Sequence, residues 1–300
     1  TFALVMIILL AFSLFFIFIG GQIAVMVTDF FQGVLMYVGF AIVLIYLLVD
    51  FDWANIVAAL QQAPENESLI NPFRSGKEKE FNVWFYLIMI FYMFYSCLAW
   101  QGRGSYNSSA KNAHEAKMGK VIGAWRTIII GMVLVFLPVC AYTVMHHPNH
   151  TDTAAQVNET ISQMDNTYLQ EQMTTPVVLS KILPTGLLGL FSAMMLAAFI
   201  STHDTYLHSW GSIFIQDIIL PFRKKPFSPK KHMFLLKLSI FGVAVFIFLF
   251  SYFFVQRINI MMFFAVTGAI FVGGVGAAII GGLYWSKGST KAAWAALFTG

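Results

Sequence analysis

A short polar cluster, Ser-Thr-His-Asp-Thr at residues 201–205, interrupts a long apolar stretch of the chain. From Leu183 to Ile218 the sequence contains no Lys, Arg or Glu. A segment this apolar is expected in lipid, where polar and ionisable side chains are costly unless they face a bundle interior or a water-filled path. The cluster is therefore a candidate functional site.

Two hydroxyls in this cluster have the chemistry of a small-cation site. On a helix, the side chains of Ser201 and Thr202 and the backbone carbonyl of Ala198 can converge on one side. A small hard cation prefers such oxygen ligands, completed by carbonyls of a neighbouring broken helix. The alternative is structural, because Ser and Thr in membrane helices often bond to the carbonyl one turn earlier and hold helices together.

Three further ionisable residues extend the candidate site. Asp204 lies four residues before His208, so the two share a helix face and form a candidate ion or proton relay. Asp29 falls near the predicted cytoplasmic end of its span, where a carboxylate lowers the barrier for a cation that leaves to the cytosol. A Ser-His-Asp hydrolase is not expected, because no nucleophile elbow is present and His203 and Asp204 point about 100° apart.

Aromatic residues concentrate in the predicted span 81–100. Those near its start are expected to be interfacial anchors. Tyr92, Tyr95, Trp100 and the following Gln101 are candidates for lining a substrate cavity.

The composition is that of a polytopic membrane protein. The 300 residues are 58% hydrophobic and 11% charged, whereas soluble domains carry about 25% charged residues. Cys97 and Cys140 both lie in apolar runs, so we expect packing roles and no disulfide. The expected partners are the lipid bilayer and a small polar solute, with no nucleic acid, and the oligomeric state is not predicted.

The apolar runs define an all-α fold, since they lack the alternation of a membrane barrel. Each run is long enough to span, since a spanning helix needs about 20 residues. The predicted spans cover residues 1–19, 22–49, 81–100, 122–145, 183–218, 233–255 and 259–285, with the start of another at 291–300. The two ends lie inside apolar segments, so we expect a piece of a longer protein.

The charges of the loops predict one orientation. Loops 103–126 and 221–231 each hold five basic residues against one acid and none, respectively. Loops 50–80 and 146–181 are richer in acids, with six and four. Because short loops rich in Lys and Arg are cytoplasmic, the first pair is predicted inside and the second pair outside.

Four stretches resemble the sodium/solute symporter family, which includes the sodium/glucose cotransporters and proline permease. Residues 20–32 are similar to its Gly-Gly…Ala-Val…Thr-Asp…Gln helix, and residues 110–116 to its Ala-Lys…Glu-Ala loop. Residues 183–218 resemble its eighth core helix, and residues 282–293 resemble the exit from its tenth. The likeness covers nearly the whole chain.

The resemblance implies a five-plus-five inverted-repeat transporter fold, of which this chain would cover core helices four to ten. It also implies that Ala198, Ser201 and Thr202 supply half of a sodium site, with Asp29 on the inward sodium path. One departure matters, because residues 100–106 replace the Asn-Gln…Gln-Arg run common in sugar-transporting relatives. A galactose-like pocket is therefore not expected.

The sequence thus predicts sodium-coupled symport of a small polar solute, a sugar or another organic solute, by alternating access. The protein would lie in the plasma membrane or a bacterial inner membrane. A transporter-like solute sensor and a proton-coupled symporter are the alternatives, and an enzyme is not expected.

Overall fold

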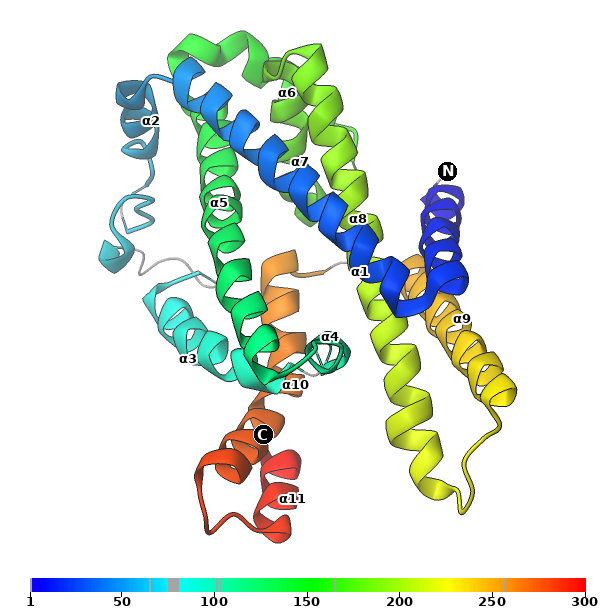
Figure 1. The fold of residues 1–300 in the computed structure, drawn as a ribbon. Helices are drawn as coiled ribbons and strands as arrows, with labels where there is room; N and C mark the ends of the chain where they lie inside the picture. The colour runs from blue at the N-terminus through cyan, green and yellow to red at the C-terminus, as the bar shows by residue number, and fades with distance from the viewer. Residues whose placement is uncertain are drawn as a thin grey trace. The chain divides into compact units, whose positions relative to one another are not determined.

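The computed structural model describes residues 2–64, 66–74, 81–100, 102, 104–164, 166–255 and 257–300. These residues form helices and no strand, which confirms the all-α prediction (Figure 1). The longer helices are α1 (Phe2–Asp50), α3 (Val83–Ala99), α5 (Ala113–His146), α7 (Thr167–Ile182), α8 (Thr185–Ile213), α9 (Pro229–Phe253) and α10 (Ile260–Tyr284). The shorter helices are α2 (Trp53–Leu60), η1 (Pro72–Arg74), α4 (Gly104–Ser108), η3 (Pro148–His150), α6 (Thr151–Ser162), η4 (Phe214–Ile219), η5 (Leu220–Phe222) and α11 (Thr290–Thr299).

Local sequence signals set where several helices begin. The side chains of Asp52, Asn82, Asn259 and Ser289 accept hydrogen bonds from the first free N–H groups of α2, α3, α10 and α11. Such N-caps satisfy donors that a helix leaves without an internal partner. Helix α9 begins instead at Pro229, whose missing N–H costs nothing in the first turn.

Helix α1 changes direction at Gly21. This residue has φ 56° and ψ −147°, which lies outside the helical region and favours glycine. The change of direction is visible along α1 in Figure 1. The helix therefore consists of two parts, and the predicted spans 1–19 and 22–49 lie on either side of the kink.

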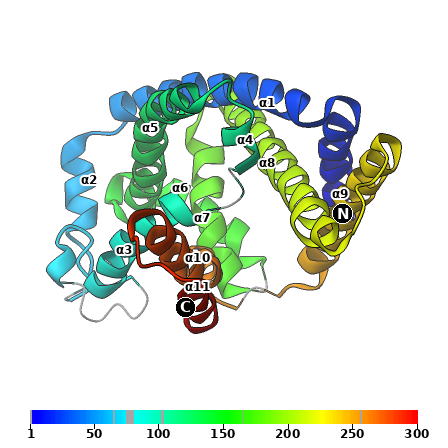
Figure 2. The same ribbon diagram turned by 60° about the horizontal axis from the view of Figure 1, so that its bottom comes forward.

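The chain divides into two compact units. Unit 1 comprises residues 1–47, 102–136 and 183–255, and unit 2 comprises residues 48–101, 137–182 and 256–300. The core of unit 1 is an apolar cluster from α1, α8 and α9, made of Leu10, Ile17, Val25, Leu207, Ile240 and Ala244. Helices α8 and α9 lie side by side in both ribbon views (Figures 1 and 2). This cluster holds α1 against α8, the two helices that carry the candidate cation ligands.

Glycines allow close packing around α10 in unit 2. A side chain at Gly268 would collide with Tyr92 of α3, and one at Gly276 would collide with Tyr95. A side chain at Gly274 would collide with the backbone of α11 at Ala296. Helix α10 thus places glycines against both α3 and α11. The helix is also bent, because its two parts, Ile260–Ala269 and Val272–Tyr284, meet at an angle of 43°.

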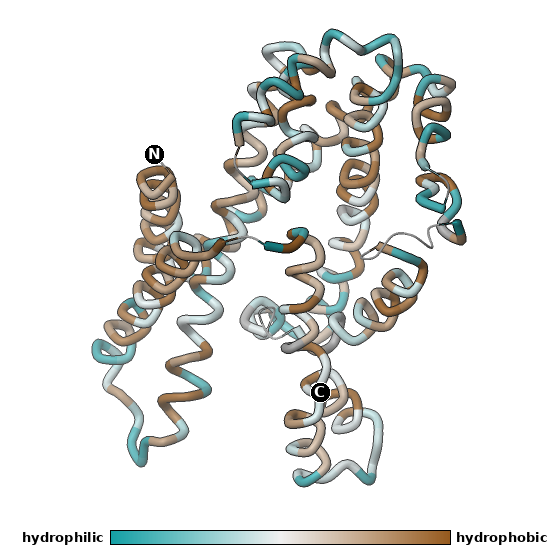
Figure 3. The backbone as a smooth tube through the Cα atoms, turned by 180° about the vertical axis from the view of Figure 1, so that it is seen from behind, coloured by the Kyte–Doolittle hydropathy of each residue, from teal (hydrophilic) through white to brown (hydrophobic). Residues whose placement is uncertain are grey.

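The surface confirms a polytopic membrane protein. Large apolar side chains are exposed along most of the length of α1, α5 and α9, and at several positions of α8, as expected where lipid replaces water. Within the described residues, the helices long and apolar enough to cross a bilayer are Phe2–Asp50, Ala113–His146, Thr185–Phe222 and Pro229–Phe253, with the bent α10 as a further candidate. Figure 3 shows these long apolar stretches and the hydrophilic loop that joins α8 to α9.

Candidate functional site

The carboxylate of Asp29 is bonded by hydroxyls from two other helices of unit 1. Its Oδ1 accepts a hydrogen bond from Ser201 Oγ at 2.6 Å. Its Oδ2 lies 3.3 Å from both Thr205 Oγ1 and Tyr106 Oη, and these two hydroxyls are 3.0 Å apart. We call these four residues the Asp29 cluster.

Helical spacing places the cluster. Ser201 and Thr205 are four residues apart on α8, so they share one face. Asp29 comes from the second part of α1, and Tyr106 comes from the short helix α4. The hydroxyl of Thr28, next to Asp29, instead donates to the carbonyls of Ala24 and Val25 at 3.0 Å and stays on its own helix. Three separate segments therefore meet at one carboxylate.

The chemistry of the cluster suits a hard cation. It offers carboxylate and hydroxyl oxygens, the ligands that hard cations prefer. The 2.6 Å contact between Ser201 and Asp29 has the length of a hydrogen bond to a charged carboxylate. Burial raises the pKa of the Tyr106 phenol to about 12, and the nearby Asp29 charge acts in the same direction. The phenol therefore stays neutral at physiological pH and keeps a proton to donate.

The three residues predicted as half of a sodium site differ in their exposure and contacts. The hydroxyl of Ser201 donates to the Asp29 carboxylate. Thr202 is exposed, and Ala198 is half-buried. The structure thus joins Ser201 to Asp29, two residues that the sequence analysis placed in separate roles.

Asp204 precedes Thr205 on α8 but is not hydrogen-bonded to the Asp29 cluster. Its side chain is fully buried, and neither carboxylate oxygen has a hydrogen-bond partner among the described residues. The buried hydroxyl of Ser13, on α1, lies within interaction range but does not meet hydrogen-bond geometry. His208 is also buried, yet it does not bond Asp204. The two residues of the predicted relay are therefore close in sequence without being connected by a hydrogen bond.

The predicted substrate-lining residues lie in unit 2. Tyr92 and Tyr95 are half-buried and pack over glycines of α10. Trp100 ends α3 and is also half-buried. Gln101 lies outside the described residues. The two tyrosines thus contact α10 within this unit, and their place in a substrate cavity stays a prediction.

Two members of the Asp29 cluster were not assigned a role from the sequence. Thr205 is four residues after Ser201, so helical spacing alone marks it as a neighbour on the same face. Tyr106 belongs to residues 100–106, the stretch that departs from the sugar-transporting pattern. Its contact with Asp29 spans 77 positions of sequence, which no local pattern reveals.

Comparison with known proteins supplies an independent observation. The model of the sodium:solute symporter family matches residues 1–300. A sodium/pantothenate symporter of Haemophilus influenzae is 25% identical over 296 residues, which cover 94% of this chain and 54% of that protein. The chain therefore spans about half the length of the curated relative that it matches.

Proposed function

Because the chain belongs to the sodium:solute symporter family, we propose that it forms part of a secondary transporter that couples sodium entry to uptake of a small polar solute. The driving force is the sodium gradient together with the membrane potential, which contributes about 2.3 kcal/mol per charge per 100 mV. Uptake proceeds by alternating access.

The observation that carries this proposal is the bonding of the Asp29 cluster. A carboxylate on α1 and hydroxyls on α4 and α8 gather on one point in a membrane-embedded unit. Ionisable side chains at membrane depth are retained for ion pathways and binding sites. A sodium ion on the inward path passes these oxygens, and its charge is balanced there by the Asp29 carboxylate.

We assign the sodium ligands on α8 to Ser201 and Thr202, with the carbonyl of Ala198, and Asp29 to the inward path. Ser201 belongs to both groups, because its hydroxyl bonds Asp29 directly. A sodium ion released from the α8 site then meets the Asp29 carboxylate next. This order explains why the acid lies one hydrogen bond away from the predicted ligands.

The solute is proposed only as a class. The curated relative is a sodium/pantothenate symporter, so small organic acids belong beside sugars and amino acids among the solutes to test. Thermal unfolding of the full-length protein in detergent tests this class directly. A ligand that binds the folded state adds about 2.7 kcal/mol to the free energy of unfolding at 100 times its Kd, and this raises the unfolding midpoint.

Two results distinguish the coupling ion. We expect a solute-induced rise of the midpoint in sodium and not in matched potassium. If the solute raises the unfolding midpoint equally in sodium and potassium, and uptake follows a pH gradient, the coupling ion would be the proton instead of sodium.

The sodium site has its own test. The double substitution Ser201→Ala and Thr202→Ala should abolish sodium-dependent uptake by the full-length protein. Intact uptake would remove both residues from the sodium site.

A further inference from the structure

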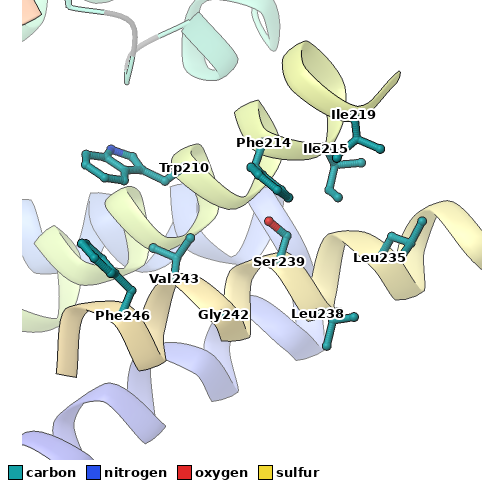
Figure 4. Close-up of a pocket in the computed structure, with 10 residues that line it drawn as sticks. All are labelled: Trp210, Phe214, Ile215, Ile219, Leu235, Leu238, Ser239, Gly242, Val243 and Phe246. Carbon is teal, nitrogen blue, oxygen red and sulfur yellow. The ribbon is translucent and has the colours of Figure 1, made fainter. Parts of the chain in front are cut away.

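An apolar groove runs between η4, the end of α8 and helix α9 in unit 1. It has a volume of about 460 Å³ and is lined by apolar side chains, with Ser239 as the polar exception among the described residues. The groove extends from Trp210 and Phe246 at one end to Ile219 and Leu235 at the other (Figure 4). Phe246 is 58% exposed, so the groove opens on the outer surface of the helix pair.

The backbone of the two helices explains why the groove exists. Gly211 of α8 lies directly against Ile240 of α9, where an added side chain would collide. Beside this contact, η4 is a π-helical turn, which is wider than an α-helical one. On α9, Gly242 contributes no side chain, and a Cβ there would meet nothing within 4 Å. Close contact on one side and missing bulk on the other leave an elongated apolar channel.

A strongly basic loop lies at one end of this groove. Ile219 and Leu235 flank a stretch with five exposed cationic residues: Arg223, Lys224 and Lys225 in the connection between η5 and α9, and Lys230 and Lys231 in the first turn of α9. The sequence contains no Asp or Glu after Asp217. The guanidinium of Arg223 lies 4.2 Å from the ring centre of Phe227, which holds one of these charges in place.

We propose that this groove and its loop bind an anionic phospholipid, with an acyl chain along the groove and the headgroup phosphate against the loop. Basic clusters beside transmembrane helices recognise anionic headgroups, and an elongated apolar channel matches a hydrocarbon chain. The positive-inside rule accounts for basic residues in the loop, but it requires no groove leading to them. A second helix would cover the apolar surface and leave the five cations unmatched.

Native mass spectrometry of the full-length protein tests the proposal, with phosphatidylglycerol and phosphatidylcholine titrated in parallel. Wild type should retain phosphatidylglycerol in preference. Gly242→Trp fills the groove and should abolish this preference, whereas Val245→Trp, on the same helix but outside the lining, should not. Equal retention of both lipids by wild type would overturn the proposal. An unchanged preference for phosphatidylglycerol in Gly242→Trp would also overturn it, and this is the result expected if another helix covers the groove.

The headgroup contact has its own matched pair of variants. Removing two cations with Lys224→Gln and Lys225→Gln should weaken phosphatidylglycerol binding about 30-fold, at about 1 kcal/mol per cationic side chain near an anionic surface. The control Lys287→Gln with Lys291→Gln removes the same charge from exposed positions elsewhere. If both double variants lost the same phosphatidylglycerol affinity, the effect would come from net charge alone, and a specific headgroup site would be refuted. Should Gly242→Trp fail to fold, as judged by its unfolding midpoint, Ser239→Met fills the same groove with less bulk.

Discussion

Replacing the Asp29 carboxylate by an amide tests the central reasoning about the cation. Asp29→Asn keeps the shape of the side chain and removes its formal charge. A cation that shares the hydroxyls bonded to Asp29, at 2.6–3.3 Å, lies within about 4 Å of the carboxylate charge. At an effective dielectric constant of about 20 this attraction is worth about 4 kcal/mol. Because the amide oxygen still offers a dipole, we expect a loss of about 2–4 kcal/mol, or roughly 30- to 700-fold in sodium affinity.

The assay is the sodium concentration that gives half-maximal solute uptake by the full-length protein in vesicles. The sodium-induced rise of the unfolding midpoint supplies a second readout that does not require transport. Asp217→Asn is the matched control, because it removes an exposed carboxylate from the same unit outside the cluster. A folded Asp29→Asn protein whose sodium dependence equals that of the control would refute a cation site at Asp29.

Three further outcomes follow from contacts in unit 1. Thr205→Val keeps the shape of the side chain and removes one hydroxyl next to Asp29. Because a hydrogen bond to a charged group is worth about 1.5 kcal/mol, the half-maximal sodium concentration should rise by about 10-fold. An unchanged half-maximal sodium concentration would exclude Thr205 from the site. Tyr106 should ionise only near pH 12, because burial raises its pKa. The stability that Tyr106 contributes is therefore complete below pH 10 and is lost as the pH rises through 12. The tyrosinate absorbance of wild type minus that of Tyr106→Phe measures this ionisation, and a difference that titrates at pH 10 would contradict the prediction. Gly211→Leu should destabilise by about 1–3 kcal/mol through overpacking against Ile240, seen as a lower unfolding midpoint than that of Gly189→Leu, where the added side chain meets open space.

The fold class could be predicted because membrane helices leave a strong compositional signal. Runs of apolar residues near 20 in length admit only helices or barrels in lipid. The change of direction at Gly21 falls where two adjacent glycines separate apolar runs. Loop orientation remains a prediction, since the helices by themselves do not indicate which side faces the cytoplasm.

The candidate site was predictable in part. The polar cluster in α8 and the intramembrane Asp29 both stand out because lipid makes such residues costly. Their direct contact could not be predicted, because the 172 positions between Asp29 and Ser201 leave the pairing of helices undetermined. The contribution of Tyr106 was hidden for the same reason. Helical periodicity places residues on a face, but only tertiary packing selects the face that meets a partner.

The kink at Gly21 has a consequence for how the chain fits a bilayer. A straight helix of the 49 residues from Phe2 to Asp50 would be about 74 Å long at 1.5 Å per residue, more than twice the thickness of the hydrocarbon core. Divided at Gly21, the two parts measure about 29 and 44 Å, each suited to a single passage. The sequence predicts one crossing for each part, and under that prediction the backbone conformation at Gly21 sets the parity of membrane crossings and the side on which every later loop emerges.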